Sequence, residues 1–199
     1  LAAATNSAAA DGSITTSTEV TAPTAAFQHS KLVIANPVTA ALSSITFSFA
    51  LNAPLGTASP EDSIALVLPS FQFAGSLGSP DESGCGSTVF TAAGANSGQT
   101  DATLTLTAGT ATLNAYQECS VTIATGVTTS SSAQGANDNA RTAAVTFLDS
   151  DVTDIGAGAI TTSTQTVAPA LTTSSLAIAV PETWAATSIS YTFEMNTAL

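Results

Sequence analysis

Positive charge is almost missing from this 199-residue chain, in which Lys31 and Arg141 are the only lysine and arginine. Two cations cannot neutralise a run of phosphates, which excludes binding to nucleic acid through its backbone. An anionic membrane surface would repel a chain with a formal net charge of -12, for the same reason. No apolar stretch reaches the length of about 18 residues that a bilayer span requires, so we expect no membrane span in this segment.

Charged residues of either sign are also few, at 8% of the chain, against about 25% in an average soluble domain. The chain contains 39 Ala, 34 Thr and 25 Ser, which together make up half of its length. Hydrophobic residues account for 44%, and this content argues against disorder. The composition therefore predicts a folded, very acidic protein rich in hydroxyl side chains.

Cysteine occurs only twice, as Cys85 and Cys119. In a chain this poor in charge and rich in hydroxyls, the pair indicates a disulfide formed in an oxidising compartment. We therefore expect an extracellular or cell-surface location. The alternative is two reduced, buried thiols in a cytosolic protein.

Residues suited to catalysis are scarce. His29 is the only histidine, and its neighbours form no hydrolase motif. Two carboxylates could serve a glycosidase, but nothing in the sequence pairs the loop acids. We expect that the protein is not an enzyme and that it uses no cofactor, with calcium as the one possible exception.

Calcium is suggested by Asp149, Asp151 and Asp154, which place three carboxylates in one turn. Hard cations take several oxygen ligands, and calcium can stiffen a junction between domains. The spacing does not match an EF-hand loop, so an acidic, solvated turn remains the alternative.

The chain repeats itself at long range. The segment 30–37 returns at 174–181, and 45–52 returns at 189–196, both with an offset of 144. Upstream, the sequence Ile-Thr-Thr-Ser-Thr occurs at 14–18 and again at 160–164, with an offset of 146. An ordered series of matches with one period predicts a tandem array.

The repeat divides the chain into three parts. Residues 1–30 are expected to be the tail of a preceding repeat with its linker strand, 31–174 a complete repeat with the following linker, and 175–199 the first strands of the next. We expect that the polypeptide is a mature product or a piece of a longer one. The hydrophobic hairpin in 175–199 is expected to be completed either by further chain or by a neighbouring molecule.

Hydrophobic residues alternate with polar ones along most apolar segments, as in Ile45, Phe47, Phe49 and Leu51. Turn sequences rich in Gly, Pro, Asn and Asp separate seven or eight such segments in each repeat. This pattern predicts an all-β fold, an antiparallel β-sandwich of immunoglobulin-like or jelly-roll type.

Glycosylation is the strongest chemical expectation. No Asn-x-Ser/Thr sequon is present, so sugars would attach to Ser, Thr or modified Pro. Ser/Thr clusters are typical of O-glycosylated stalks, although Thr also suits the outer face of a strand. The candidate positions are Thr15, Thr16, Ser17, Thr18, Thr128, Thr129, Ser130, Ser131, Ser132, Thr161, Thr162, Ser163, Thr164, Pro23, Pro37, Pro169 and Pro181.

The motifs of the repeat carry a resemblance. They are Leu-x-Ile-x-x-Pro, Ile-Thr-Phe-Ser-Phe-x-Leu-Asn-x-Pro-Leu, the segment 62–71, Cys-Ser-Val-Thr-Ile at 119–123, and 137–142. The chain resembles tandem β-sandwich repeats of algal and protist cell-surface proteins, and the subunits of heavily glycosylated fibrils from natural waters. The resemblance covers nearly all of 31–174 and implies an extracellular fibre built from sandwiches. It carries over no catalytic residue.

We therefore expect a structural subunit of an extracellular glycosylated fibril, whose partners are covalent glycans and copies of itself or adjoining repeats. The linker segments 14–23 and 160–169 are expected to pair with the adjoining unit by β-augmentation. The residues expected at polymer contacts are Ile14, Val20, Ile160, Val167, Leu176 and Ile178. The alternative is a carbohydrate- or surface-binding adhesin module, which needs exposed aromatic residues such as Trp184.

Overall fold

The computed structural model of the protein describes residues 24–56, 61–109, 111–148, 152–167, 171–178 and 189–195. All secondary-structure elements in these ranges are β-strands, as the alternation of hydrophobic residues predicted. No helix capable of crossing a membrane occurs within the same ranges.

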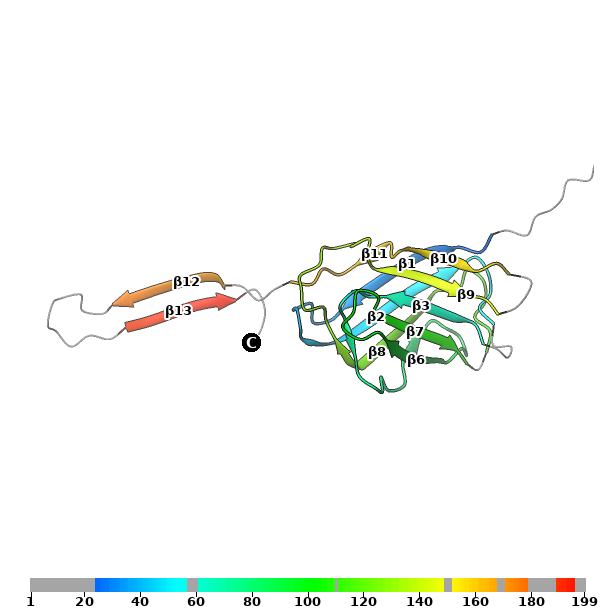
Figure 1. The fold of residues 1–199 in the computed structure, drawn as a ribbon, viewed down its shortest axis with the longest axis horizontal. Coiled ribbons are helices and arrows are strands. Elements are labelled where there is room, and N and C mark those ends of the chain that lie inside the picture. The colour runs from blue at the N-terminus through cyan, green and yellow to red at the C-terminus, as the bar shows by residue number, and fades with distance from the viewer. Residues whose placement is uncertain are drawn as a thin grey trace, which may run out of the picture.

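The strands form two sheets and a separate hairpin (Figure 1). The six-stranded sheet contains, in order, β11 (Thr162–Ser163), β1 (Phe27–Ile34), β2 (Leu42–Leu51), β8 (Cys119–Thr128) and β4 (Gln72–Phe73), with β5 (Asp81–Ser83) also paired to β8. The five-stranded sheet contains β10 (Ile155–Ala159), β9 (Thr142–Thr146), β3 (Ser63–Val67), β7 (Thr103–Ala108) and β6 (Phe90–Ala95). The hairpin pairs β12 (Leu171–Ile178) with β13 (Ile189–Met195). We call the two sheets together the two-sheet unit.

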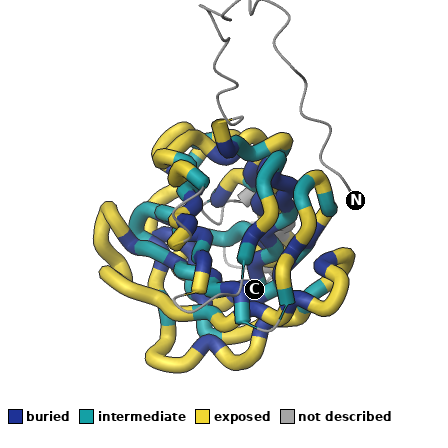
Figure 2. The backbone as a smooth tube through the Cα atoms, turned by 90° about the vertical axis from the view of Figure 1, so that its right-hand side faces the viewer, coloured by how far each residue is buried: buried dark blue, intermediate teal, exposed yellow. Residues whose placement is uncertain are grey.

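The hydrophobic residues of both sheets form one core cluster. In β2, Ile45, Phe47, Phe49 and Leu51 are each at most 1% exposed, which confirms the predicted face of this strand. Phe47 stacks on Phe49 with ring centroids 5.4 Å apart and meets Phe27 edge-on. In Figure 2, exposed stretches lie mainly around the outside of the tube. The burial patterns of β2 and β7 show buried residues recurring along the strands.

Hydroxyl side chains on the other face of β2 pair with hydroxyls on β8. Thr46 and Thr122 lie 2.8 Å apart between their Oγ1 atoms, and Ser48 and Ser120 lie 2.7 Å apart between their Oγ atoms. Such cross-strand hydroxyl pairs each stabilise a sheet modestly. They give a structural reason for part of the Ser/Thr content.

Several short strands were not expected from the sequence. The Gly156–Gly158 stretch lies in β10 and pairs with β9 through Gly158 and Ala143. Residues 81–83 form β5 against β8. These strands have three and five residues and lack alternating large hydrophobic side chains, so periodicity does not detect them.

The strands of the β12–β13 hairpin pair in the same register as β1 and β2, at an offset of 144 residues. Leu32 pairs with Phe47, and 144 residues later Leu176 pairs with Tyr191. The irregularity between Phe27 and His29 likewise returns in the hairpin, between Leu171 and Thr173. The sequence match of these segments is therefore accompanied by a match in strand pairing.

The environments of the two hairpins differ. Leu32 and Phe47 are each 1% exposed, whereas Leu176 and Tyr191 are 64% and 56% exposed. Figure 1 shows the β12–β13 hairpin standing apart from both sheets. Two apolar positions that are buried in the β1–β2 pair, Leu32 and Phe47, thus have exposed counterparts in the hairpin, Leu176 and Tyr191.

Candidate functional site

Residues 160–167 follow β10 and contain β11, the edge strand of the six-stranded sheet beside β1. We call these residues the closing segment. It runs parallel to β1, with Lys31 opposite Thr162 and Leu32 opposite Ser163. The amide of Thr164 donates to the carbonyl of Leu32 at 3.0 Å. Further along, Val38 and Val167 form a parallel bridge.

Residues 134–141 contact the other edge of the closing segment. The Ile160 amide donates to the Arg141 carbonyl at 3.0 Å, and Gln134 and Thr166 exchange two backbone hydrogen bonds. The Ser163 amide donates to Asn137 Oδ1 at 2.7 Å. The closing segment therefore lies in a slot between β1 and residues 134–141, which we call the strand slot.

Arg141 holds the closing segment from inside the unit. Its side chain is 0% exposed, and its Nη1 donates to Ser163 Oγ at 3.2 Å and to the carbonyl of Thr164. Nε and Nη2 both donate to Gln134 Oε1, at 3.1 and 2.9 Å. The guanidinium also lies 5.8 Å from the centre of the Phe71 ring, a cation–π contact.

Burial lowers the pKa of the Arg141 guanidinium, and the negative charge of Asp138 opposes this shift. The hydrogen-bond acceptors that Arg141 contacts are all neutral oxygens. An arginine remains protonated in proteins, so a buried one must satisfy several donors at once. Here the closing segment supplies two of the acceptors, Ser163 Oγ and the Thr164 carbonyl. Burial of the charged Arg141 side chain therefore depends on the closing segment being in place.

The predicted disulfide is present between Cys85 and Cys119. Cys119 begins β8, and Cys85 follows β5, so the bond ties the loop after β5 to the six-stranded sheet. Both residues are at most 3% exposed. Burial of the bond protects it from exchange with external thiols.

Two of the three predicted calcium ligands, Asp149 and Asp151, lie outside the described residues. Asp154 is described, and its Oδ1 accepts the Phe147 amide at 2.8 Å. Among the described residues, no group of three His, Cys, Asp or Glu side chains is placed to hold a metal ion. Asp154 thus has a structural role, and the three-carboxylate site stays a prediction.

The glycan candidates differ in accessibility. Thr129 and Ser130 are 0% exposed, and Ser163 is 7% exposed. Thr129 Oγ1 accepts the Ala41 amide and donates to the Val38 carbonyl. A sugar cannot attach to these three hydroxyls in the folded unit, which removes them from the set of attachment points.

The accessible candidates form a smaller set. Ser131, Ser132, Thr161 and Thr162 are exposed, and Thr128, Thr164 and Pro37 are half-buried or exposed. The remaining candidates lie outside the described residues and are Thr15, Thr16, Ser17, Thr18, Pro23, Pro169 and Pro181.

The candidates for polymer contacts are also placed unequally. Ile160 is 2% exposed and packs in the core of its own two-sheet unit, while Val167 is half-buried and forms a bridge with Val38, beyond the end of β1. Leu176 is exposed on the hairpin, and Ile178 pairs with Ile189 in the same hairpin. Ile14 and Val20 lie outside the described residues.

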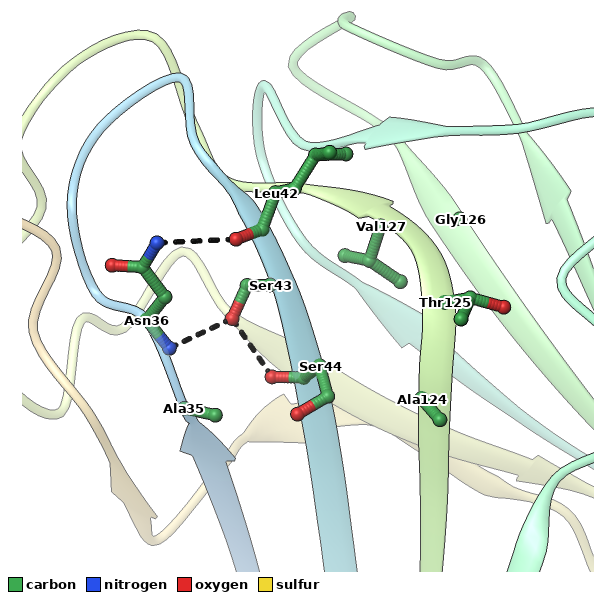
Figure 3. Close-up of a pocket in the computed structure, with 9 residues that line it drawn as sticks. All are labelled: Ala35, Asn36, Leu42, Ser43, Ser44, Ala124, Thr125, Gly126 and Val127. Carbon is green, nitrogen blue, oxygen red and sulfur yellow. Dashed lines mark hydrogen bonds between the residues drawn. The ribbon is translucent and has the colours of Figure 1, made fainter.

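A cavity of about 420 Å³ opens between the end of β1, β2 and β8 (Figure 3). In it, Asn36 donates to the Leu42 carbonyl from Nδ2 and to Ser43 Oγ from its amide. The lining residues are Ala35, Asn36, Leu42, Ser43, Ser44, Ala124, Thr125, Gly126 and Val127. None is titratable or aromatic, so this cavity offers neither acid–base chemistry nor a stacking surface for sugars.

Comparison of the chain with protein-family models, with curated proteins and with solved structures finds no significant match. The functional interpretation therefore rests on the residues themselves. Of these, Arg141 and Gln134 were not predicted as site residues. The one signal in the sequence was that Arg141 is the only arginine in the chain.

Proposed function

We propose that the protein is a structural subunit of an extracellular glycosylated fibril, which polymerises head to tail through strand pairing between units. In this proposal, the two-sheet unit is an antiparallel β-sandwich, and the chain contains the start of a second one. The observation that carries it is the β12–β13 hairpin, whose register matches that of β1–β2 pair by pair, including the irregularity.

An exposed hairpin of this kind needs a partner. Leu176 and Tyr191 occupy positions whose counterparts, Leu32 and Phe47, are buried core residues. An isolated two-stranded hairpin is only marginally stable in water, and its open edges invite further strands. In the fibril, the strands of the next unit cover this apolar face, as the rest of the unit covers β1 and β2.

Replacing Leu176 by aspartate tests this assembly contact. We expect Leu176→Asp to abolish the sedimentation of fibrils, because a carboxylate cannot be buried in the next unit without a partner. Val89→Asp is the matched control, since Val89 is 47% exposed on the two-sheet unit and receives the same charge. Analytical ultracentrifugation of both variants measures the effect. Fibrils that survive in Leu176→Asp would rule out the hairpin as the contact.

The sugar coat is supported by the surface chemistry. The chain has few charged residues to keep its surface solvated, and hydroxyl-rich sheets with free edges tend to associate. The exposed hydroxyls of Ser131, Ser132, Thr161 and Thr162 are accessible attachment points.

Intact mass measurement of residues 1–199, obtained from the natural source, tests the coat. The unmodified polypeptide weighs 19.6 kDa. We expect a higher and heterogeneous mass, with spacings of one hexose or pentose. A single species at the polypeptide mass would remove glycosylation from the proposal while leaving the fibril to be tested separately.

A further inference from the structure

The chain contains two copies of the sequence that occupies the strand slot. The bound copy, Ile-Thr-Thr-Ser-Thr at 160–164, is part of the closing segment, and the second copy is at 14–18. We propose that the strand slot binds residues 14–18 of a second copy of the chain, in exchange for its own residues 160–164. This inference rests on the proposed function and specifies its head-to-tail contact.

Side chains shared by the two copies make most of the contacts in the slot. Ile160 is 2% exposed, Thr161 Oγ1 lies 3.2 Å from Ser30 Oγ, and Ser163 Oγ accepts from Arg141. Thr164 Oγ1 accepts the Ile34 amide at 3.2 Å. Residues 14–18 supply the same five side chains, so every one of these contacts can form with the exchanged segment.

The first position at which the sequences of the two copies differ is exposed, so a different side chain fits there. Gln165 is exposed, and Glu19 takes its place in the other copy. Thr166 is buried, and its counterpart Val20 has a similar shape without the hydroxyl. The backbone amide of Gln134, which contacts the Thr166 hydroxyl, also donates to the Thr166 carbonyl, so the exchange leaves this amide with a partner.

Chain connectivity favours a second molecule as the source. The closing segment is parallel to β1, and a parallel neighbour within one chain requires a connection of about a dozen residues or more. Only eight residues, 19–26, separate residues 14–18 from the start of β1. Residues 14–18 therefore cannot readily pair in this way with the β1 that follows them, but they can enter the slot of another copy.

Exchange of the five identical residues has a low energetic cost, because their contacts that break within one chain form again between two chains. Only the hydrogen bonds of the Thr166 hydroxyl, which Val20 lacks, are lost. The exchanged segment is followed, after eight residues, by β1 and β2 of its own unit. The closing segment leads in the same way into the β12–β13 hairpin. Each exchange thus joins one complete unit to the next, and since the contact is head to tail it can continue along a filament.

Cysteine cross-linking in the full chain tests the exchange. Lys31 and Thr162 are paired on neighbouring strands, which lie about 4.8 Å apart and within disulfide range. Thr16 is the counterpart of Thr162 at the offset of 146. In the Lys31→Cys/Thr16→Cys variant, oxidation is expected to convert monomer into dimers and higher species on a non-reducing gel.

Two controls define the result. Lys31→Cys/Thr162→Cys, oxidised in dilute solution where the chains are unassembled and keep their own segment in the slot, is expected to give an intramolecular cross-link and remain monomeric, which shows that position 31 reacts across the slot. Thr91→Cys/Thr16→Cys reports random collisions, because Thr91 is exposed on β6 in the other sheet.

The outcomes separate this inference from the proposed function. A ladder in Lys31→Cys/Thr16→Cys but not in the collision control supports exchange. A monomeric product, whether unreacted or internally cross-linked, overturns it. Sedimentation of the same variant under reducing conditions then shows whether fibrils form without exchange, in which case the proposed function survives with a different contact.

Discussion

Arg141→Ala is expected to lower the free energy of unfolding by about 3–5 kcal/mol, close to the largest effects that single substitutions produce. The substitution removes the donor from the buried Ser163 Oγ and from the half-buried oxygens of Gln134 and Thr164. Each buried polar group without a partner costs about 1–3 kcal/mol. It also removes the contact with the Phe71 ring. Urea unfolding followed by far-ultraviolet circular dichroism measures the change.

Arg141→Lys is the matched variant. A lysine keeps the charge, but its single ammonium group cannot reproduce the planar fork that reaches Gln134 and the closing segment together. We expect a loss of stability between those of the wild type and Arg141→Ala. If Arg141→Ala unfolds at the same urea concentration as the wild type, the closing segment is not held by this side chain.

Phe47→Ala is expected to lower the free energy of unfolding by about 3–5 kcal/mol, the usual cost of truncating a buried phenylalanine. Phe47 is 1% exposed and contacts the rings of Phe27 and Phe49. Tyr191→Ala, at the equivalent position of the β12–β13 hairpin, is expected to change the stability of the unassembled chain by less than about 0.5 kcal/mol, as exposed positions usually do.

Calorimetry at low protein concentration compares the two variants. The contrast measures how much the environment of Tyr191 in the hairpin differs from that of Phe47 in the core. Equal destabilisation by Phe47→Ala and Tyr191→Ala would mean that the hairpin is already part of a folded core, and would contradict the proposal that it awaits the strands of the next unit.

The strands that carry the core were predictable because each alternates hydrophobic and polar residues over at least five positions. β2 and β7 are examples, with every second residue buried. The disulfide was predictable for a different reason, because the chain contains only two cysteines.

The remaining features depend on tertiary contacts that no local pattern encodes. An arginine is rarely fully buried, so the interior position of Arg141 follows only from the oxygens of Gln134 and the closing segment. Thr129 resembles its neighbours in a Ser/Thr cluster but is buried because its hydroxyl bonds to Val38 and Ala41. β10 consists of Gly and Ala after Ile155, and it is a strand because β9 offers an edge.

The sequence match between the two hairpins was visible from the residues alone, whereas their common strand register comes from the structure. The offset of 144 aligned Leu32 with Leu176 and Phe47 with Tyr191. Leu176 pairs with Tyr191 in the same register as Leu32 with Phe47. A biased amino-acid composition alone would not produce this agreement in register. A one-residue slip would have reversed the faces of both strands.

Electron microscopy of the natural protein, purified without denaturation, tests the central proposal most directly. The proposal predicts filaments with an axial repeat of a few nanometres, about the length of one unit, and a width greater than the polypeptide alone can fill. Discrete particles without axial order would contradict it, and they would favour an adhesin module of a cell-surface protein instead.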